Sequence, residues 1–181
     1  MKGIVFSEFL DMVDDKFSIE MSERLIDEVN PPSGGAYTTV GTYDSQEIVD
    51  LVAKLSEFSS IPVPDLLKAF GRHLLKRFVV MFPEFFEEAT STLNFLPKVE
   101  SYVHLEVKKL YNDAELPSFT FATPHPGRLE MTYRSSRNLP DLAEGLIQGT
   151  ADHFNERIEV KRSSLPEDPS VELFIIIKLQ D

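Results

Sequence analysis

Tyr133, Ser135 and Arg137 occupy alternate positions of a segment with strand character. Because side chains alternate between the two faces of a strand, all three are expected on one face, together with Leu129 and Met131. Their phenol, hydroxyl and guanidinium groups all donate hydrogen bonds, and a guanidinium matches a carboxylate or phosphate in bidentate geometry. Such a row fits a ligand with an apolar body and anionic arms. The alternative is that Arg137 lies beyond the strand and pairs with a surface carboxylate.

The four histidines give a second place to look for chemistry. No two of them lie three or four residues apart, so no single helix offers a pair of metal-ligating imidazoles. His104 differs from the other three because it lies at the edge of an apolar stripe on a predicted helix over 97–112. From the residues alone, His104 is either a hydrogen-bonded packing residue or an axial metal ligand.

Composition excludes several classes of protein. The 181 residues include 18 Lys and Arg, 30 Asp and Glu and no Cys, and the formal net charge is −12. Without Cys there are no disulfides, zinc–thiolate sites, iron–sulfur clusters or thiol nucleophiles. The negative charge argues against binding to nucleic acid or to anionic membranes. No segment resembles a signal peptide or a membrane span, so a single-domain cytoplasmic protein is expected.

Hydrophobic periodicity predicts the elements that must position these residues. Helices are predicted at about 3–15, 20–29, 45–59, 64–81, 84–93 and 97–112. Two β-hairpins are predicted on either side of a helix at 140–156, namely 118–122 with 128–136 and 157–162 with 171–179. This order predicts an α+β fold in which helices cover one face of a four-stranded antiparallel sheet. The common hydrolase, metallopeptidase and nucleotide-binding motifs are missing, so no enzymatic activity is expected.

Over nearly its whole length the sequence resembles a known family. Residues 1–5, 68–72 and 103–107, and above all the pattern Tyr133-x-Ser135-x-Arg137, are similar to the heme-nitric oxide/oxygen binding (H-NOX) domain. This is the sensor domain of soluble guanylate cyclases and of stand-alone bacterial gas sensors. The pattern is short, but it lies about thirty residues after a helical His and before a helix with Gly145-Leu146-Ile147, which makes it specific.

The resemblance implies a fold and a set of site residues. It implies an N-terminal helical lobe over about 1–62 and a lobe over about 63–181 that encloses heme b (iron protoporphyrin IX). His104 would be the axial iron ligand, and Pro117 would press on the heme and distort it. The heme propionates would be held by Tyr133, Ser135 and Arg137. The apolar pocket for the gas would be lined by Ile4, Val5, Leu74, Phe78, Leu142 and Leu146.

The resemblance also implies which gas is sensed and how. Oxygen-binding members carry a Tyr at the position of Leu142, because bound dioxygen needs a hydrogen-bond donor that NO does not need. A sensor selective for NO is therefore expected, with weaker CO binding and no stable dioxygen complex. NO would weaken the bond from His104 to iron and move the N-terminal lobe. No output domain is evident in 181 residues, so the expected partner is a separate histidine kinase or cyclic-di-GMP enzyme.

Two other functions stay open at this point. One is a heme-free module that uses Tyr133, Ser135 and Arg137 to bind a carboxylate-bearing ligand. The other is a heme-based binder of dioxygen or CO, or a heme enzyme. Some relatives hold a structural zinc through cysteines near the C-terminal hairpin. Since this chain has none, packing of residues 174–177 is expected to hold that hairpin instead.

Overall fold

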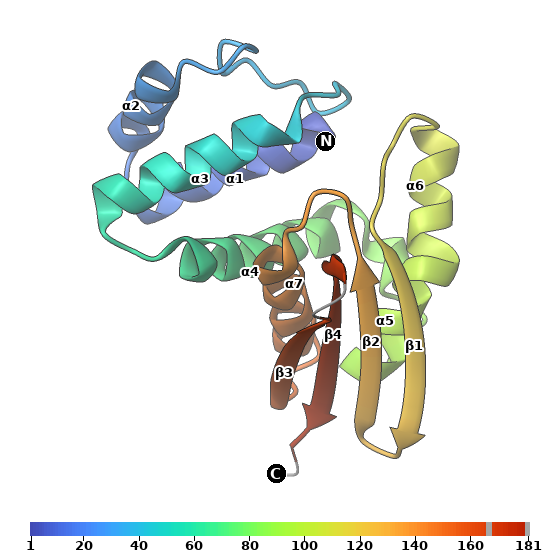
Figure 1. The fold of residues 1–181 in the computed structure, drawn as a ribbon. Coiled ribbons are helices and arrows are strands. Elements are labelled where there is room, and N and C mark those ends of the chain that lie inside the picture. The colour runs from blue at the N-terminus through green and yellow to red at the C-terminus, as the bar shows by residue number, and fades with distance from the viewer. Residues whose placement is uncertain (166–167, 180–181) are drawn as a thin grey trace.

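The computed structural model describes residues 1–165 and 168–179 (Figure 1). The first half is helical, and the bounds are α1 (Gly3–Lys16), α2 (Ile19–Val29), α3 (Ser45–Ser59) and α4 (Val63–Met81). Ser18 and Asp44 accept hydrogen bonds from backbone amides in the first turns of α2 and α3, which satisfies donors that a helix start leaves unpaired. Pro64 lies in the first turn of α4, where its missing N–H costs nothing. These four predicted helices are confirmed.

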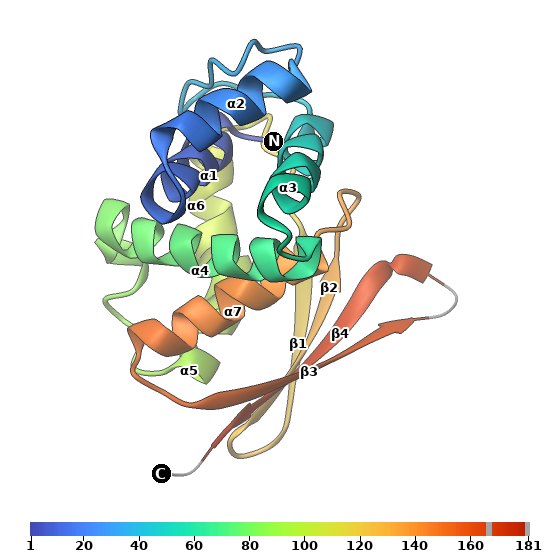
Figure 2. The same ribbon diagram turned by 90° about the vertical axis from the view of Figure 1, so that its left-hand side faces the viewer.

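The helices α1–α3 pack around a shared apolar core and stand on one side of α4 (Figure 2). Phe6, Phe9 and Leu25 are completely buried in this core. A charged contact also joins α1 to α4, because the buried carboxylate of Glu8 on α1 accepts a 2.8 Å hydrogen bond from Nε of Arg77 on α4.

Among the described helices, none has the length and apolar character that a membrane span requires.

The segment between α4 and the sheet differs from the prediction. The predicted helix over 84–93 is wrong, because only a 3₁₀ turn forms at Pro83–Phe85 and α5 (Thr92–Lys98) begins after Ser91. Ser91 caps α5, and the carboxylate of Glu156 accepts a hydrogen bond from the amide of Thr92 at 2.8 Å. A contact between residues 64 positions apart thus helps set where this helix starts.

The helix that carries His104 is also irregular. The prediction that Pro97 opens a helix over 97–112 is wrong, because Pro97 lies inside α5. A widened π-helical turn, η2 (Val99–Val103), follows it, and α6 (His104–Leu110) begins at His104 itself. A proline inside a helix removes one backbone hydrogen bond and crowds the preceding turn, which favours such an irregularity.

The last third of the chain forms the predicted antiparallel sheet. The strands are β1 (Ser118–His125), β2 (Arg128–Arg134), β3 (Ile158–Leu165) and β4 (Asp168–Lys178), in the order β1-β2-β4-β3. The helix α7 (Pro140–His153) connects β2 to β3. The α+β fold is confirmed, but the first hairpin turns more tightly than predicted, because β1 runs on to His125 and Gly127 adopts a φ of 79°. The predicted connection of the second hairpin, over 163–170, includes residues 166–167, which lie outside the described residues.

One face of the sheet packs on helices. Leu129, Met131 and Tyr133 of β2 alternate as buried residues, as predicted, and Phe174 and Ile176 of β4 are buried beside them. This cluster packs against side chains of α5 and α7, which supports the expected apolar packing of the C-terminal hairpin. Figure 1 shows α1–α3 and the sheet at opposite ends of the molecule, with α4 and α7 between them.

The helices α4 and α7 approach each other closely where two glycines meet. A Cβ atom added to Gly145 would overlap the carbonyl oxygen of Lys68, and one added to Gly71 would overlap that of Leu142. Both obstacles are backbone atoms, so a side chain cannot rotate out of the way. The close approach therefore depends on glycine at these positions.

We expect Gly145→Ala to lower the free energy of unfolding by about 2 kcal/mol or more, although alanine favours a helix by about 1 kcal/mol over glycine. Urea unfolding followed by circular dichroism measures this. The control is Gly149→Ala, where the added Cβ would meet its nearest neighbour, a side-chain atom of Leu75, at 3.0 Å and the effect should be smaller. Equal stability of the Gly145→Ala variant and the wild type would contradict the close approach.

Candidate functional site

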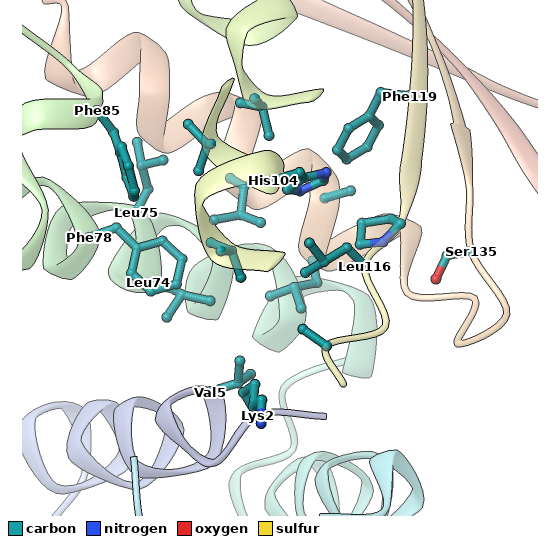
Figure 3. Close-up of a pocket in the computed structure, with 18 of the residues that line it drawn as sticks. Lys2, Val5, Leu74, Leu75, Phe78, Phe85, His104, Leu116, Phe119 and Ser135 are labelled. Atoms are coloured by element: carbon teal, nitrogen blue, oxygen red, sulfur yellow. The ribbon is translucent and has the colours of Figure 1, made fainter. Parts of the chain in front are cut away.

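A cavity of about 350 Å³ lies between α4, α6, α7, the start of β1 and the end of β2 (Figure 3). Its size falls within the range of sites for small organic ligands, about 300–1,000 Å³. Its walls are mostly aliphatic and aromatic side chains, with a few polar groups among them. All eleven residues predicted for the site line this one cavity, namely Ile4, Val5, Leu74, Phe78, His104, Pro117, Tyr133, Ser135, Arg137, Leu142 and Leu146.

His104 is mostly buried at the first position of α6, with 15% of its side chain exposed. Its Nδ1 lies 3.1 Å from a carboxylate oxygen of Glu100, and none of the described residues forms a hydrogen bond with its Nε2. Burial lowers the pKa of His104, although the Glu100 carboxylate opposes the shift. This shift favours the neutral imidazole, which can offer one lone pair to a metal.

Two further residues hold His104 and were not predicted. Glu100 precedes it by four residues, a spacing that brings side chains together on a helix and that would have identified this contact. The ring of Phe119 on β1 stacks on the imidazole, with ring centroids 5.4 Å apart and an angle of 27° between the planes. Nothing in the local sequence indicates Phe119, because this contact depends on how β1 packs against α6.

The three predicted donors lie together, although they do not share one strand face. Tyr133 is the last buried residue of β2, which ends at Arg134, so the predicted strand over 128–136 is too long. The hydroxyl of Ser135 accepts a hydrogen bond from the amide of Arg137 at 3.2 Å, which closes a local turn. Such a turn competes with further strand pairing and gives a physical reason for the strand end.

Arg137 combines features of both interpretations considered for it. It lies beyond the strand and pairs with Glu115, donating to its carbonyl oxygen at 2.6 Å and approaching its carboxylate at 3.4 Å. Its guanidinium nevertheless lines the cavity, and only 17% of its side chain is exposed. The phenol oxygen of Tyr133 nearby accepts a 3.2 Å hydrogen bond from the amide of Leu139. Positive charge and hydroxyl donors thus gather at one edge of an apolar cavity.

The donor set fits a heme. A flat apolar ligand with two carboxylates needs a largely apolar cavity with cationic and hydroxyl donors at one edge, and its iron needs an axial base. The cavity supplies these features through its aliphatic and aromatic walls, Arg137 with Tyr133 and Ser135, and Nε2 of His104, which has no hydrogen-bond partner among the described residues. Leu142, Leu146, Leu74 and Phe78 add only apolar surface.

Comparisons with known proteins agree with this fit. Residues 2–162 match the Haem-NO-binding (HNOB) family model. The fold is similar to an unliganded Fe(II) H-NOX protein from K. algicida, with a TM-score of 0.93, 35% identity and coverage of 100% of this chain and 98% of that chain. It is also similar to an H-NOX protein from S. oneidensis in the Fe(II)NO state, with a TM-score of 0.91, 25% identity and coverage of 99% of this chain and 100% of that chain. The IWP-051-bound H-NOX from Shewanella woodyi in the Fe(II)CO state has a TM-score of 0.83 and 36% identity, and the match covers 99% of this chain and 95% of that chain. A search of curated proteins found no significant match.

Proposed function

Because the chain belongs to the Haem-NO-binding (H-NOX) family of heme-based gas sensors, we propose that it binds heme b, senses nitric oxide and regulates a separate signalling protein. One observation carries this proposal. His104, with its free Nε2, and the donors Tyr133, Ser135 and Arg137 come from distant segments and line a single apolar cavity. A structural role for His104 alone would not require the donors to line the same cavity.

Each site residue then has a task. When bound, the heme supplies a ferrous iron with a coordination position open to a diatomic gas. His104 presents Nε2 to the iron. Arg137, with Tyr133 and Ser135, supplies hydrogen-bond donors to the propionates, and its charge compensates theirs. Pro117 borders the same cavity with a conformationally restricted ring and would press on the heme.

The apolar part of the cavity favours NO over dioxygen. The side chains of Ile4, Val5, Leu142 and Leu146 line it and carry no hydrogen-bond donor. Pocket polarity and donors decide whether heme proteins hold dioxygen. NO needs no donor, so it should bind tightly, CO more weakly, and dioxygen without a stable complex.

Contacts at the far end of α6 support a conformational output. Asp113 follows this helix, and one of its carboxylate oxygens lies 2.9 Å from Nζ of Lys2 while the other accepts a 2.8 Å hydrogen bond from Thr42. These hydrogen bonds lower the pKa of Asp113. A shift of His104 and α6 would strain contacts to residues that flank α1 and α3. We therefore propose that residues 1–62 move relative to residues 63–181 when His104 is released.

The partner and the location are proposed from the sequence and not from the site. The resemblance favours a histidine kinase or a cyclic-di-GMP enzyme as the partner. A net charge of −12 favours docking on a basic face of that partner, with an association rate that falls as salt rises. A cytoplasmic location stays a prediction from the sequence.

Absorption spectra of the reduced, heme-loaded protein test the proposal. We expect NO and CO to shift the heme bands, and exposure to air to give no stable dioxygen spectrum. In Leu142→Tyr, a hydroxyl in the pocket should lengthen the lifetime of the dioxygen complex by about tenfold or more, because a hydrogen bond to a charged group contributes about 1.5–3 kcal/mol. The matched control is Leu142→Phe, which adds the ring without the hydroxyl.

The outcomes separate the competing functions. A wild-type protein that holds dioxygen stably in air would contradict selectivity for NO and favour the dioxygen binder. A protein that shows no heme absorption after expression with added heme would favour the heme-free carboxylate module. If Leu142→Phe stabilised dioxygen as much as Leu142→Tyr, pocket shape and not a donor would control the gas.

A further inference from the structure

One carboxylate oxygen of Glu100 connects two elements around His104. Oε2 of Glu100 lies 3.1 Å from Nδ1 of His104 and accepts a hydrogen bond from the backbone amide of Phe119 at 3.2 Å. Glu100 lies in the π-helical turn η2, whereas Phe119 lies on the edge strand β1. The carboxylate therefore bridges the imidazole and the sheet, and the hydrogen bond from Phe119 helps to hold it beside His104.

The imidazole is held from a second side as well. The ring of Phe119 stacks on it, so the same residue orients the carboxylate through its amide and packs on the imidazole through its side chain. The side chain of Glu100 is 39% exposed, compared with 15% for His104. The carboxylate thus reaches solvent while it fixes a group that is mostly buried.

The hydrogen bond selects one tautomer of His104. An ionised carboxylate can only accept hydrogen bonds, so Nδ1 of the neutral imidazole must carry the hydrogen. The lone pair is then on Nε2, the nitrogen that makes no hydrogen bond with the described residues. Without Glu100, the hydrogen could move to Nε2 and block that nitrogen as a ligand.

We propose that Glu100 is a positioning residue that holds His104 as the Nδ1-protonated tautomer and sets how firmly this histidine binds the heme iron. The proposal rests on the proposed function and adds to it a residue that controls the switch. A carboxylate that accepts the hydrogen bond of a ligating histidine raises the basicity of the ligand and fixes its ring. Glu100 therefore opposes the release of His104, and its strength as an acceptor adjusts how readily the gas triggers the change.

The heme-free protein gives the first test. Nitrogen-15 NMR of the imidazole should show His104 of the wild type as the Nδ1-protonated tautomer. Glu100→Gln keeps an amide oxygen as a weaker acceptor and should largely retain it, whereas Glu100→Ala should give a mixture. A wild-type His104 protonated at Nε2 would overturn the proposal. This result needs no variant, so it decides the proposal even if Glu100→Ala fails to fold.

The heme-loaded protein gives the second test. The iron–histidine stretching frequency, measured by resonance Raman spectroscopy of the reduced protein, should fall from the wild type to Glu100→Gln and further to Glu100→Ala. Heme affinity of Glu100→Ala should fall by about tenfold, as is typical for the loss of a partner of a metal ligand. The matched control is Glu106→Gln on α6. The carboxylate of Glu106 pairs with Lys109 at 2.6 Å, so this variant should leave both quantities unchanged.

The two proposals fail in different ways. An unchanged stretching frequency in Glu100→Ala, with His104 still the ligand, overturns the role of Glu100 and leaves the gas sensor intact. A protein that binds no heme, or binds it without His104, overturns the proposed function, whereas the tautomer of the heme-free protein still reports on Glu100.

Discussion

Replacement of His104, the proposed axial ligand, by Gly is expected to reduce the heme content of the purified protein by about tenfold or more, since loss of even an outer partner of a metal ligand costs about 10–100-fold in affinity. Among the described residues, His104 is the only histidine that lines the cavity. No other imidazole is therefore placed to take over. Heme content is measured from the absorption of the purified protein relative to its protein concentration.

Free imidazole provides the decisive readout for this variant. Because His104→Gly leaves a space where the ring stood, added imidazole should restore heme binding and much of the wild-type ferrous spectrum. The control is His125→Ala, which removes an exposed imidazole at the end of β1 and should leave the spectrum unchanged. If His104→Gly kept both the heme content and the spectrum of the wild type, the axial assignment would be wrong.

Replacement of Arg137 by Ala is expected to lower heme affinity by about 10–100-fold, because a hydrogen bond to a charged group contributes about 1.5–3 kcal/mol. The other two residues of the motif, Tyr133 and Ser135, are uncharged hydroxyls and cannot replace the charge of Arg137. Arg137→Lys keeps the charge but loses the bidentate geometry and should give an intermediate affinity. Transfer of heme to apomyoglobin measures the relative rates of heme loss.

A matched control for this prediction lies three residues earlier. Arg134 is exposed and pairs with Asp168 at 2.7 Å outside the cavity. Arg134→Ala therefore removes the same charge without touching the site and should retain heme as the wild type does. Full heme occupancy in Arg137→Ala would contradict the assignment of Arg137 to the propionates, and it would leave the proposed role of His104 unaffected.

Local patterns were sufficient for much of the fold. The first four helices follow from apolar periodicity and from caps such as Ser18 and Asp44, whose partners lie within three residues. The alternation along β2 correctly predicted that Leu129, Met131 and Tyr133 share the buried face. Each of these features depends on neighbours in the chain, so the sequence carries it directly.

Packing between distant segments decided where the predictions were wrong or incomplete. The start of α5 is set in part by Glu156, which is 64 residues from Thr92, and hydrophobic periodicity cannot predict such a contact. The end of β2 before Arg137 follows from a turn that Ser135 closes, so Ser135 and Arg137 reach the cavity from a loop, whereas Tyr133 reaches it from the strand.

The site shows the same division. The types and spacing of His104, Tyr133, Ser135 and Arg137, together with a family resemblance, were sufficient to nominate a heme pocket. Their shared cavity, and the contacts of Phe119 with His104 and Glu100, arise only when the segment that carries these two residues packs against β1. Residue types determine which chemistry is available. Contacts between segments far apart in the chain determine which of these side chains meet in one site, because the orientation of a side chain is set by its neighbours in the folded protein.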